Sequence, residues 1–479
     1  MEKKALEEIV GIDYVLDDPE TLESHSMDRS FFEPRRPSYV VKPKITEEVQ
    51  AVVKLANKNL TPIIPVSSGS HFYGATIPQQ GGIILDLSRM NKILNVDRRN
   101  RTIRIEPGVT WGRIKKELKS YDLMPLPPLL PHSTKSALTS AVEREPMLIP
   151  KTEYGEPVLT MEVVLPNGEI FRTGSASVGP PDDIQTDLVG PSGPGLDWFR
   201  LFQGTQGTFC VATWVNMKAP PLPKREKVFF IPFQKIEGVK KPLYAILRQM
   251  LGAECFLLNR FNLACILAKK WPADFKNLKK GLPPFTLILC LSGGKILPKE
   301  KIDYQEADLR EIVRRFKMKL KTDLPGTGGK KGVYLLNLLR SPWEKEPYWK
   351  ERFKERCCDI FFYTTLDRVP YFTKLVNKMA SQKGYDIREI GLYLQPLEGG
   401  RAYHLEFNFP WNKEDKEKVY DLYLNLSTCL VNEGAFFGRP YGKWSELVYN
   451  RNSALTDTLG NLKKVLDPNH IMNPGRLCF

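Results

Sequence analysis

Apolar residues in the N-terminal part of the chain alternate between helical and extended spacing. In "TEEVQAVVKLANK" (46–58), Val49, Val52, Val53 and Ala56 recur at helical intervals and form one apolar stripe. Thr46 can cap this helix, and the two glutamates after it suit the positive end of the helix dipole. Strand-like runs at 60–66, 81–87 and 101–108, followed by a helical run at 109–118, predict a small α/β unit.

Further along the chain, the pattern predicts a hairpin, a boundary and a second region of mixed structure. "GEPVLTMEVVLPNGEIFRTG" (155–174) predicts a hairpin that turns at Asn167-Gly168. The proline- and charge-rich run "APPLPKREK" (219–227) marks a change of character. Strand-like "PPFTLILCLSGG" (283–294) and amphipathic "YQEADLREIVRRFKMKL" (304–320) lie beyond it. The run 459–479 predicts a helix and an apolar finish that packs onto a domain already built.

Length and composition narrow the class of protein. A chain of 479 residues is too long for one ordinary core, so we expect two or three domains. It is 42% apolar and 26% charged, as soluble globular proteins are, and we expect no membrane span because no long uncharged apolar run occurs. The charged start "MEKKALEEIV" lacks the apolar core of a signal peptide. Eight scattered cysteines without a CxxC pair favour reduced thiols in a cytoplasm and no metal or iron–sulfur site.

The formal net charge of +15 leaves three interpretations open: a nucleic acid, an acidic ligand or protein partner, or a generally basic proteome. Lysines cluster at 268–281 and 328–332, but no nucleic-acid-binding motif surrounds either cluster. We therefore expect no nucleic-acid partner, and a solvated basic face is the simplest interpretation.

The run "PVSSGSHFYGATIPQQGGIILDLSRM" (65–90) concentrates glycine and serine just before an apolar strand. Glycine permits positive φ and close approach of a ligand to the backbone, and successive loop amides with serine hydroxyls can cradle a diphosphate. Neither the P-loop nor the GxGxxG signature is present. From these residues alone, a diphosphate cradle and a tight turn with incidental serines remain equally open.

A resemblance adds to this interpretation. The glycine loop, "GGIILDLSRMNKI" and "EPGVT" together resemble the FAD-binding subdomain of the vanillyl-alcohol oxidase / p-cresol methylhydroxylase flavoprotein superfamily. Three later segments resemble that family in the same order: "TEYGEPVLTMEVVLPNGEIFRTG" (152–174), "LDWFRLFQGTQGTFCVATWVNMKAPP" (196–221) and "LDPNHIMNPGR" (466–476). The middle region matches only weakly.

The resemblance implies an α+β fold in which FAD lies extended between two α/β subdomains. The family has a two-subdomain PCMH-type FAD-binding domain and an α+β cap, or substrate, domain with an antiparallel sheet. On this chain we expect the FAD-binding domain over 1–222, the cap over 223–438, and a C-terminal segment, 439–479, that returns to the FAD domain.

The resemblance also implies which residues bind FAD. The residues expected to hold the diphosphate are Ser67, Ser68, Gly69, Ser70, His71, Tyr73 and Gly74. Those expected to line the flavin are Gly204, Gln206, Gly207 and Val211, and those expected to close the site over it are Asn473 and Gly475. The chain departs from the family at the second diphosphate segment, "PHSTKSALTSAVEREP" (131–146), which lacks the usual glycine pair. Candidates to take over there are Ser133, Thr134, Ser140 and Glu143.

Two histidines are candidates for chemistry. His71 resembles the histidine of the "SGGH" loop in berberine-bridge-type members, which is joined to the flavin; a loop histidine that only hydrogen-bonds is the alternative. His404 resembles the cap-strand histidine of the vanillyl-alcohol oxidase branch, and here it is a candidate base or substrate contact. Strand alternation puts Glu406 on the same face as His404, but two residues are too few for a metal site, so no metal is expected. A structural sheet-face histidine remains the alternative.

Arg439, in "NEGAFFGRPYGKW" (432–444), resembles the arginine that meets an anionic substrate or the reduced flavin in the phenol-oxidising branch. Arginine stays charged and can fork onto a carboxylate or a phenolate. The tyrosine that usually precedes it is replaced by Gly438, which weakens the case for phenols, and Tyr441 or Tyr154 is the candidate hydroxyl. An ordinary surface arginine is the alternative.

These residues and the resemblance predict an FAD-dependent oxidoreductase, a dehydrogenase or oxidase that removes hydride from an alcohol, a 2-hydroxy acid or a phenol. The alternatives are a non-redox FAD enzyme of the alkylglycerone-phosphate-synthase type and a flavin electron-transfer subunit. The expected partners are a small-molecule substrate and a protein electron acceptor, either an electron-transferring flavoprotein or an iron–sulfur subunit. A homodimer is left open.

Overall fold

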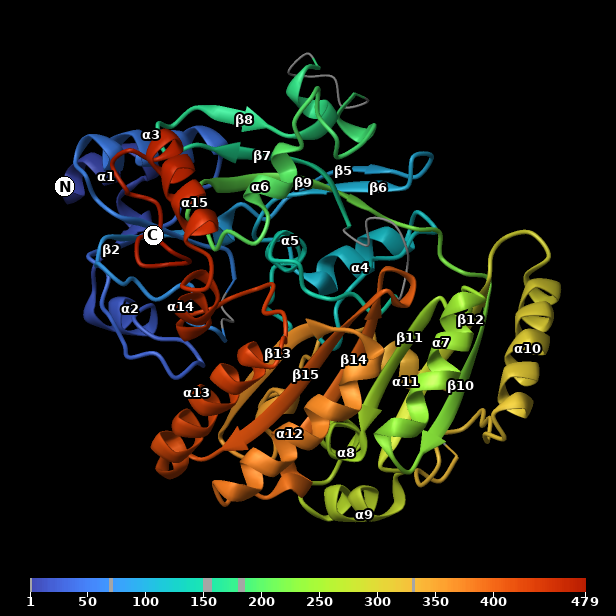
Figure 1. Ribbon diagram of the computed structural model, residues 1–479. Helices are drawn as coiled ribbons and strands as arrows, with labels where there is room; N and C mark the ends of the chain where they lie inside the picture. Colours follow the sequence, from blue (N-terminus) through green and yellow to red (C-terminus); the bar gives the residue numbers. More distant parts are fainter. Residues whose placement is uncertain (1, 69–71, 150–156, 180–185, 330–331) are drawn as a thin grey trace.

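The described residues form three sheets, two in the upper half of the molecule and one in its lower half (Figure 1). The computed structural model describes residues 2–68, 72–149, 157–179, 186–329 and 332–479. In the described residues no helix is both long and apolar enough to cross a membrane.

The first sheet is small and mixed. Its strands follow the order β1 (Val15–Leu16), β2 (Tyr39–Val41), β4 (Ile83–Asp86) and β3 (Ile63–Val66), with β2, β4 and β3 parallel. The helices of this part are α1 (Lys3–Val10), α2 (Pro19–Ser24) and α3 (Thr46–Lys58). The predicted helix 46–58 is confirmed, and Val49, Val52, Val53 and Ala56 are fully buried because their common stripe faces the core.

The second sheet is antiparallel. Its strands follow the order β5 (Ile93–Asp97), β6 (Thr102–Ile105), β9 (Val211–Lys218), β7 (Val158–Val164) and β8 (Ile170–Arg172). Its helices are α4 (Trp111–Lys119), α5 (Ala137–Val142) and α6 (Trp198–Phe202). The predicted hairpin is confirmed as β7–β8, and Gly168 at its turn has φ +81°. The predicted helix 109–118 corresponds to α4, which begins two residues later and ends one residue later.

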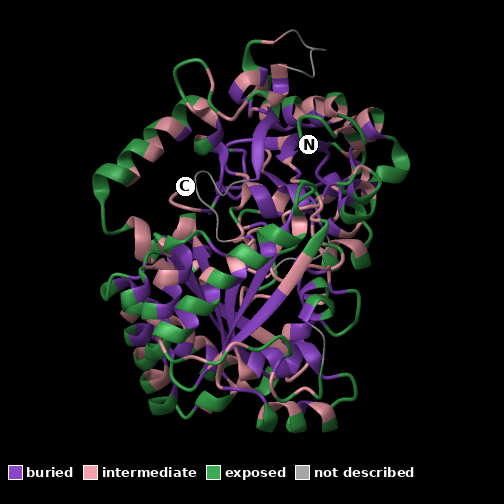
Figure 2. Cartoon of the chain, turned by 90° about the vertical axis from the view of Figure 1, so that its right-hand side faces the viewer, coloured by how far each residue is buried: buried purple, intermediate pink, exposed green. Residues whose placement is uncertain are grey.

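The third sheet has six antiparallel strands and forms the cap. Their order is β10 (Arg225–Phe233), β12 (Phe285–Gly293), β11 (Glu254–Asn259), β14 (Gly391–Leu397), β15 (Ala402–Trp411) and β13 (Arg356–Thr364). Along β10, Phe229 and Ile231 enter one core while Val228 and Phe230 enter the other, because side chains alternate across a strand. Both faces are therefore buried, and Figure 2 shows these strands buried (purple) behind helices that carry exposed residues (green).

Helices cover both faces of the cap sheet. One core includes residues of α7 (Lys240–Arg248), α10 (Pro298–Arg315), α12 (Val369–Gln382) and α13 (Lys416–Asn432); the other includes residues of α8 (Arg260–Leu267), α9 (Ala273–Gly281) and α11 (Gly332–Leu339). The predicted helix 304–320 starts earlier and stops earlier, as α10. The predicted α+β class with an antiparallel cap sheet is confirmed. The second sheet ends at Lys218 and the cap sheet begins at Arg225, and the three domain boundaries stay predictions.

The C-terminal segment returns to the first sheet, where Figure 1 shows it (red) beside the N-terminal part (blue). It contains α14 (Lys443–Tyr449) and α15 (Ser453–Leu466). After α15, the chain pairs with the outer edge of β3: Ile63 N donates to Ile471 O (2.7 Å), and Asn473 N donates to Ile63 O (2.8 Å). The tail thus covers an edge strand whose backbone groups would otherwise be unpaired.

Candidate cofactor and substrate site

A cavity opens between the first two sheets at the end of β3. Its walls come from the loop after β3, from α5, from the turn that precedes β9, and from the C-terminal segment at Tyr441. The hydroxyls of Ser67 and Thr139 hydrogen-bond across it, and the cavity measures about 130 Å³. A dinucleotide in an extended conformation could pass through the cavity only if the hydrogen bond between Ser67 and Thr139 breaks.

Three buried polar atoms have no hydrogen-bond partner in the described structure: Oε1 of Gln206, which lines this cavity, and Ser68 Oγ and Asn473 Oδ1, which belong to residues next to its lining. Asn473 donates its other amide atom to Ala75 O (3.0 Å) and Gln206 O (2.7 Å), so it joins the loop after β3 to the turn before β9. Unpaired buried polar groups are costly, and a polar ligand would satisfy them. These residues fit the polar parts of FAD.

Glycines let the loop and the turn come close together. Gly207 has φ +73°, and a Cβ there would lie 2.5 Å from Pro65 Cγ. Gly74 has φ +77°, and a Cβ there would lie 2.3 Å from the ring of Phe32. Any larger residue at either position would clash as well as strain the backbone.

Glu143 connects this cavity to the C-terminal segment. It accepts hydrogen bonds from Gln206 N (3.1 Å) and from the hydroxyl of Tyr441 (3.0 Å). Burial raises the pKa of Glu143, and burial likewise raises that of Tyr441. The geometry thus brings Glu143, Gln206 and Tyr441 together, from three separate parts of the chain.

Other predicted FAD residues lie further from the cavity. Ser140 accepts from Trp111 Nε1 (3.1 Å) and donates to Ser136 O (3.0 Å), so it is engaged inside the second subdomain. Thr134 contacts His132 Nδ1 (3.0 Å). Val211 packs in the core of the first sheet, while its neighbours Cys210 and Ala212 line the cavity.

Three more of the predicted residues lie at the edges of this region. Ser133 donates its backbone N–H to Trp343 O (3.1 Å), Gly204 has φ +72°, and Gly475 has φ +83° beside Gln79. Gly69, Ser70 and His71, as well as Tyr154, lie outside the described residues, so flavin attachment through His71 stays a prediction.

A second cavity, of about 90 Å³, lies between the segments that flank α5 (128–135 and 145–146) and the cap sheet, and Arg439 lines it. Arg439 is only 5% exposed, and its Nε and Nη1 have no hydrogen-bond partner in the described structure. Its guanidinium lies 4.4 Å from the ring centroid of Phe361. Burial alone would lower the pKa of Arg439, but Tyr441, Tyr363 and Glu145 together raise it, so the group keeps its charge. The surface-arginine alternative does not fit this burial.

A buried ionic network lines the cap side of the same cavity. Lys350 Nζ lies 2.6 Å from Asp359 Oδ2 and 2.7 Å from Glu406 Oε1. Asn408 Nδ2 donates to Asp359 Oδ1 (2.6 Å) and to Glu406 Oε1 (2.7 Å). Burial would raise the pKa of Glu406, but Lys350 and His404 lower it, so the carboxylate is held ionised. The sequence reasoning missed Lys350 and Asp359, whose meeting depends on the cap sheet rather than on a local motif.

His404 lies behind Glu406 and has no exposed surface. Its Nε2 is 3.2 Å from Glu406 Oε2, and its Nδ1 has no partner in the described structure. Because Glu406 is ionised, Nε2 carries the proton of the neutral ring. Burial lowers the pKa of His404, and Arg439 lowers it further. Glu406, not His404, is the member of this pair that lines the cavity.

Comparison with known proteins identifies an FAD-binding domain in this chain. Residues 37–174 match the family profile described as an FAD binding domain. The chain is 29% identical over 460 residues to D-lactate dehydrogenase of Anaerostipes hadrus, covering 93% of this chain and 90% of that one. It is 29% identical over 215 residues to the glycolate oxidase subunit GlcD of Bacillus subtilis, covering 44% of this chain but only 43% of that relative.

The fold has a close match among solved structures. Substrate-bound p-cresol methylhydroxylase superposes with a TM-score of 0.84 at 19% identity, covering all of this chain and 96% of that one. The profile match, the end-to-end similarity to a dehydrogenase and this fold agree with the ordered motifs. Residues 37–174 are an FAD-binding domain, and the chain is an FAD-linked oxidoreductase with the fold of p-cresol methylhydroxylase.

Proposed function

We propose that this FAD-linked oxidoreductase acts on a 2-hydroxy acid and converts it to the 2-oxo acid. The single observation that carries the proposal is Arg439, a buried guanidinium that lines the cap-side cavity and has two donors without partners in the described residues. A buried charge without a partner is costly, and a carboxylate matches the fork of an arginine with two parallel hydrogen bonds. The relatives named for D-lactate and glycolate act on molecules of this class.

The chemistry divides between cofactor and chain. FAD, when bound, supplies the acceptor for hydride. Arg439 would hold the substrate carboxylate, and Glu406 would accept the hydrogen bond of the substrate hydroxyl. The hydride would leave with the two electrons of the carbinol C–H bond, and the hydroxyl proton would leave by way of Glu406 to solvent, because Lys350 and His404 keep that carboxylate ionised. His404 and Lys350 hold that carboxylate in place from behind.

The experiment is anaerobic reduction of the bound flavin, followed by its absorbance. D- and L-2-hydroxy acids should bleach it, with one enantiomer preferred, whereas the matching 2-methoxy acids should not, because they have no hydroxyl proton to give up. If only phenols bleach the flavin, the substrate class is wrong. If no donor bleaches it, a non-redox FAD enzyme or an electron-transfer subunit becomes the better interpretation.

Re-oxidation would use a separate protein, either an electron-transferring flavoprotein or an iron–sulfur subunit. The chain carries a net charge of +15, which would attract an acidic partner, and the Bacillus subtilis relative is named as a subunit. Association should weaken as ionic strength rises, which co-purification at low and high salt would measure. We also propose a cytoplasmic location, because all eight cysteines are free thiols; cell fractionation tests it.

A further inference from the structure

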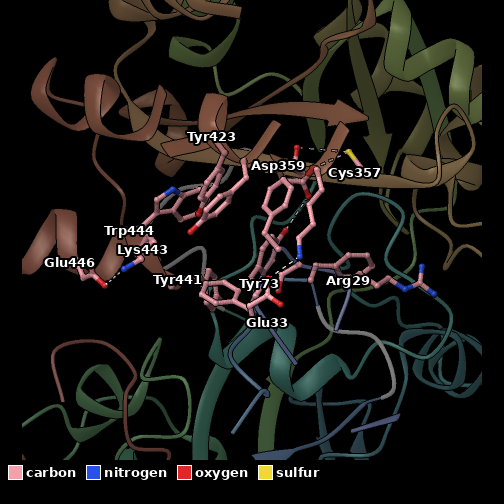
Figure 3. Close-up of a pocket in the computed structure, with 18 of the residues that line it drawn as sticks. Arg29, Glu33, Tyr73, Cys357, Asp359, Tyr423, Tyr441, Lys443, Trp444 and Glu446 are labelled. Carbon is pink, nitrogen blue, oxygen red and sulfur yellow. Dashed lines mark hydrogen bonds and ion pairs between the residues drawn. The ribbon is translucent and has the colours of Figure 1, made fainter. Parts of the chain in front are cut away.

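A third, larger chamber, whose lining Figure 3 shows, shares Tyr73 with the Arg439 cavity. It has a volume of about 570 Å³ and lies between the segment 29–35, α13 and the start of the C-terminal segment. We call it the aromatic chamber because six of its wall residues are Phe31, Trp411, Tyr420, Tyr423, Tyr441 and Trp444. Its volume lies in the range of pockets that bind drug-sized molecules.

The rings of the chamber are packed against one another and present their remaining faces to it. Phe31 stacks on Trp411 with centroids 4.9 Å apart, and Tyr423 lies 5.5 Å from Trp444. Trp411 is only 5% exposed, and its indole N–H has no hydrogen-bond partner in the described residues. A buried tryptophan N–H usually finds an acceptor. The chamber therefore offers flat apolar walls and, just beneath them, two unused donors without accessible surface of their own, Trp411 Nε1 and Arg476 Nε.

Most charged residues at the chamber already have partners, although Arg35 and Arg476 donate to backbone carbonyls rather than to a carboxylate. Lys416 lies 2.9 Å from Glu33, and Lys443 lies 2.8 Å from Glu446. Arg29 is paired with Glu351. Paired charges of both signs do not select a charged ligand, so the group that suits this chamber is neutral and planar.

Only one layer of side chains separates the aromatic chamber from Arg439. Tyr73 and Asp359 line both spaces. The ring of Tyr73 stacks on Tyr441 at 4.9 Å, and its hydroxyl makes a long hydrogen bond (3.3 Å) to Asp359 Oδ2. The Arg439 cavity holds about 90 Å³, enough for a carboxylate and its carbinol but too little for a ring as well. A larger substrate would have to extend into the chamber, with Tyr73 turning aside.

We propose that the substrate is an aryl-substituted 2-hydroxy acid, whose ring occupies the aromatic chamber and carries an oxygen that accepts from Trp411 Nε1. This inference rests on the proposed function for the carboxylate end, and the chamber supplies the substrate class. Lactate or glycolate would leave the chamber walls without a partner.

Calorimetric titration of the FAD-loaded enzyme tests the chamber without turnover. The probes are propanoate, 3-phenylpropanoate and 3-(4-hydroxyphenyl)propanoate, which lack the hydroxyl that would be oxidised. The phenyl compound should bind about tenfold more tightly than propanoate, from ring contacts alone. The hydroxyphenyl compound should gain about fivefold more from the indole N–H. Equal affinities for all three probes would overturn the proposal. It would also be overturned if a neutral quinone competed with the probes and bound more tightly than they do.

Two variants and one control test whether the aryl group of the probes binds in the aromatic chamber. Trp411→Phe keeps the ring but removes the N–H, so it should abolish the advantage of the hydroxyphenyl probe and leave phenyl binding unchanged. Tyr420→Ala, on the half-buried face of α13, should weaken both aryl probes about fivefold and leave propanoate unchanged. Tyr304→Ala is the matched control, because that side chain is 74% exposed on α10. Unchanged aryl affinities in both chamber variants would overturn the proposal.

The two proposals fail separately. If aryl acids bind the chamber but no hydroxy acid bleaches the flavin, the chamber proposal survives as a ligand site and the proposed function is wrong. If lactate and 3-phenyllactate bleach the flavin with equal KM, the proposed function stands and the aryl substrate class is wrong.

Discussion

Replacement of Arg439 by methionine should stabilise the free enzyme while it abolishes anion binding. In the structure the guanidinium is buried with Nε and Nη1 unpaired. Two unpaired donors cost about 1–3 kcal/mol each, and the contact with Phe361 at 4.4 Å returns about 0.5–2 kcal/mol. Methionine has a similar length and needs no partner, so Arg439→Met should gain about 0–5.5 kcal/mol of unfolding free energy, with a midpoint of about 3 kcal/mol.

The assay combines thermal unfolding with a ligand that is not oxidised. Arg439→Met should melt a few degrees higher than wild type without ligand. Oxalate at 100 times its dissociation constant should stabilise the wild type by about 2.7 kcal/mol, and it should leave the variant unchanged. Arg439→Lys keeps the charge but not the fork, so its oxalate affinity should fall in between. Arg314→Met, at an exposed position on α10, is the control and should behave like wild type.

One result would refute the reasoning about Arg439. If Arg439→Met melts several degrees lower and still binds oxalate as the wild type does, the guanidinium serves the fold and the proposed carboxylate contact is absent. The control variant shows whether any change in melting comes from the loss of one positive charge on a strongly basic chain.

Three further predictions concern other parts of the molecule. Burial lowers the pKa of His404, so the folded state resists its protonation; wild-type stability should fall as pH drops below about 6.5, and His404→Gln should lose part of that slope in urea titrations at pH 7.5 and 5.5. Gly207→Ala would place a Cβ 2.5 Å from Pro65 Cγ at φ +73°, and it should cost at least about 1–3 kcal/mol and weaken FAD retention on gel filtration. Lys463 is fully buried and donates to Asp467 Oδ2 (2.6 Å), so Lys463→Met should cost about 3–5 kcal/mol by denaturant unfolding; a smaller loss would mean that the carboxylate is reached by water.

Local patterns predicted the elements whose reasons are local. The stripe in 46–58 fixed α3 because helical spacing and burial agree there, and Asn167-Gly168 placed the β7–β8 turn. The glycine-rich loop signalled close approach of the backbone, and Gly74 and Gly207 do approach neighbouring rings at positive φ. Helix ends were less exact, because propensity does not determine where tertiary packing stops a helix.

The cap side of the site could not be predicted in the same way. Asp359 faces Asn408 only because β13 and β15 pair in one register, and Lys350 reaches them from a short helical turn before β13. No motif within the sequence couples these positions, because the contact spans about fifty residues and depends on strand pairing. The sequence predicted that His404 and Glu406 share one face of a strand, but it did not predict that Glu406 is the one that lines the cavity.

The C-terminal tail can pair with β3 only when synthesis of the chain is almost complete. Ile63 leaves the ribosome roughly 400 residues before Ile471 and Asn473, which at about 5–20 residues per second is a delay of roughly 20–80 s. During that delay the outer edge of β3 is unpaired, and it can pair with an extended segment of another newly made chain. Protection of this edge by chaperones, rather than the stability of the finished protein, would then decide the yield of soluble protein. Slower translation would lower the yield, because it lengthens the time for which the edge is unpaired.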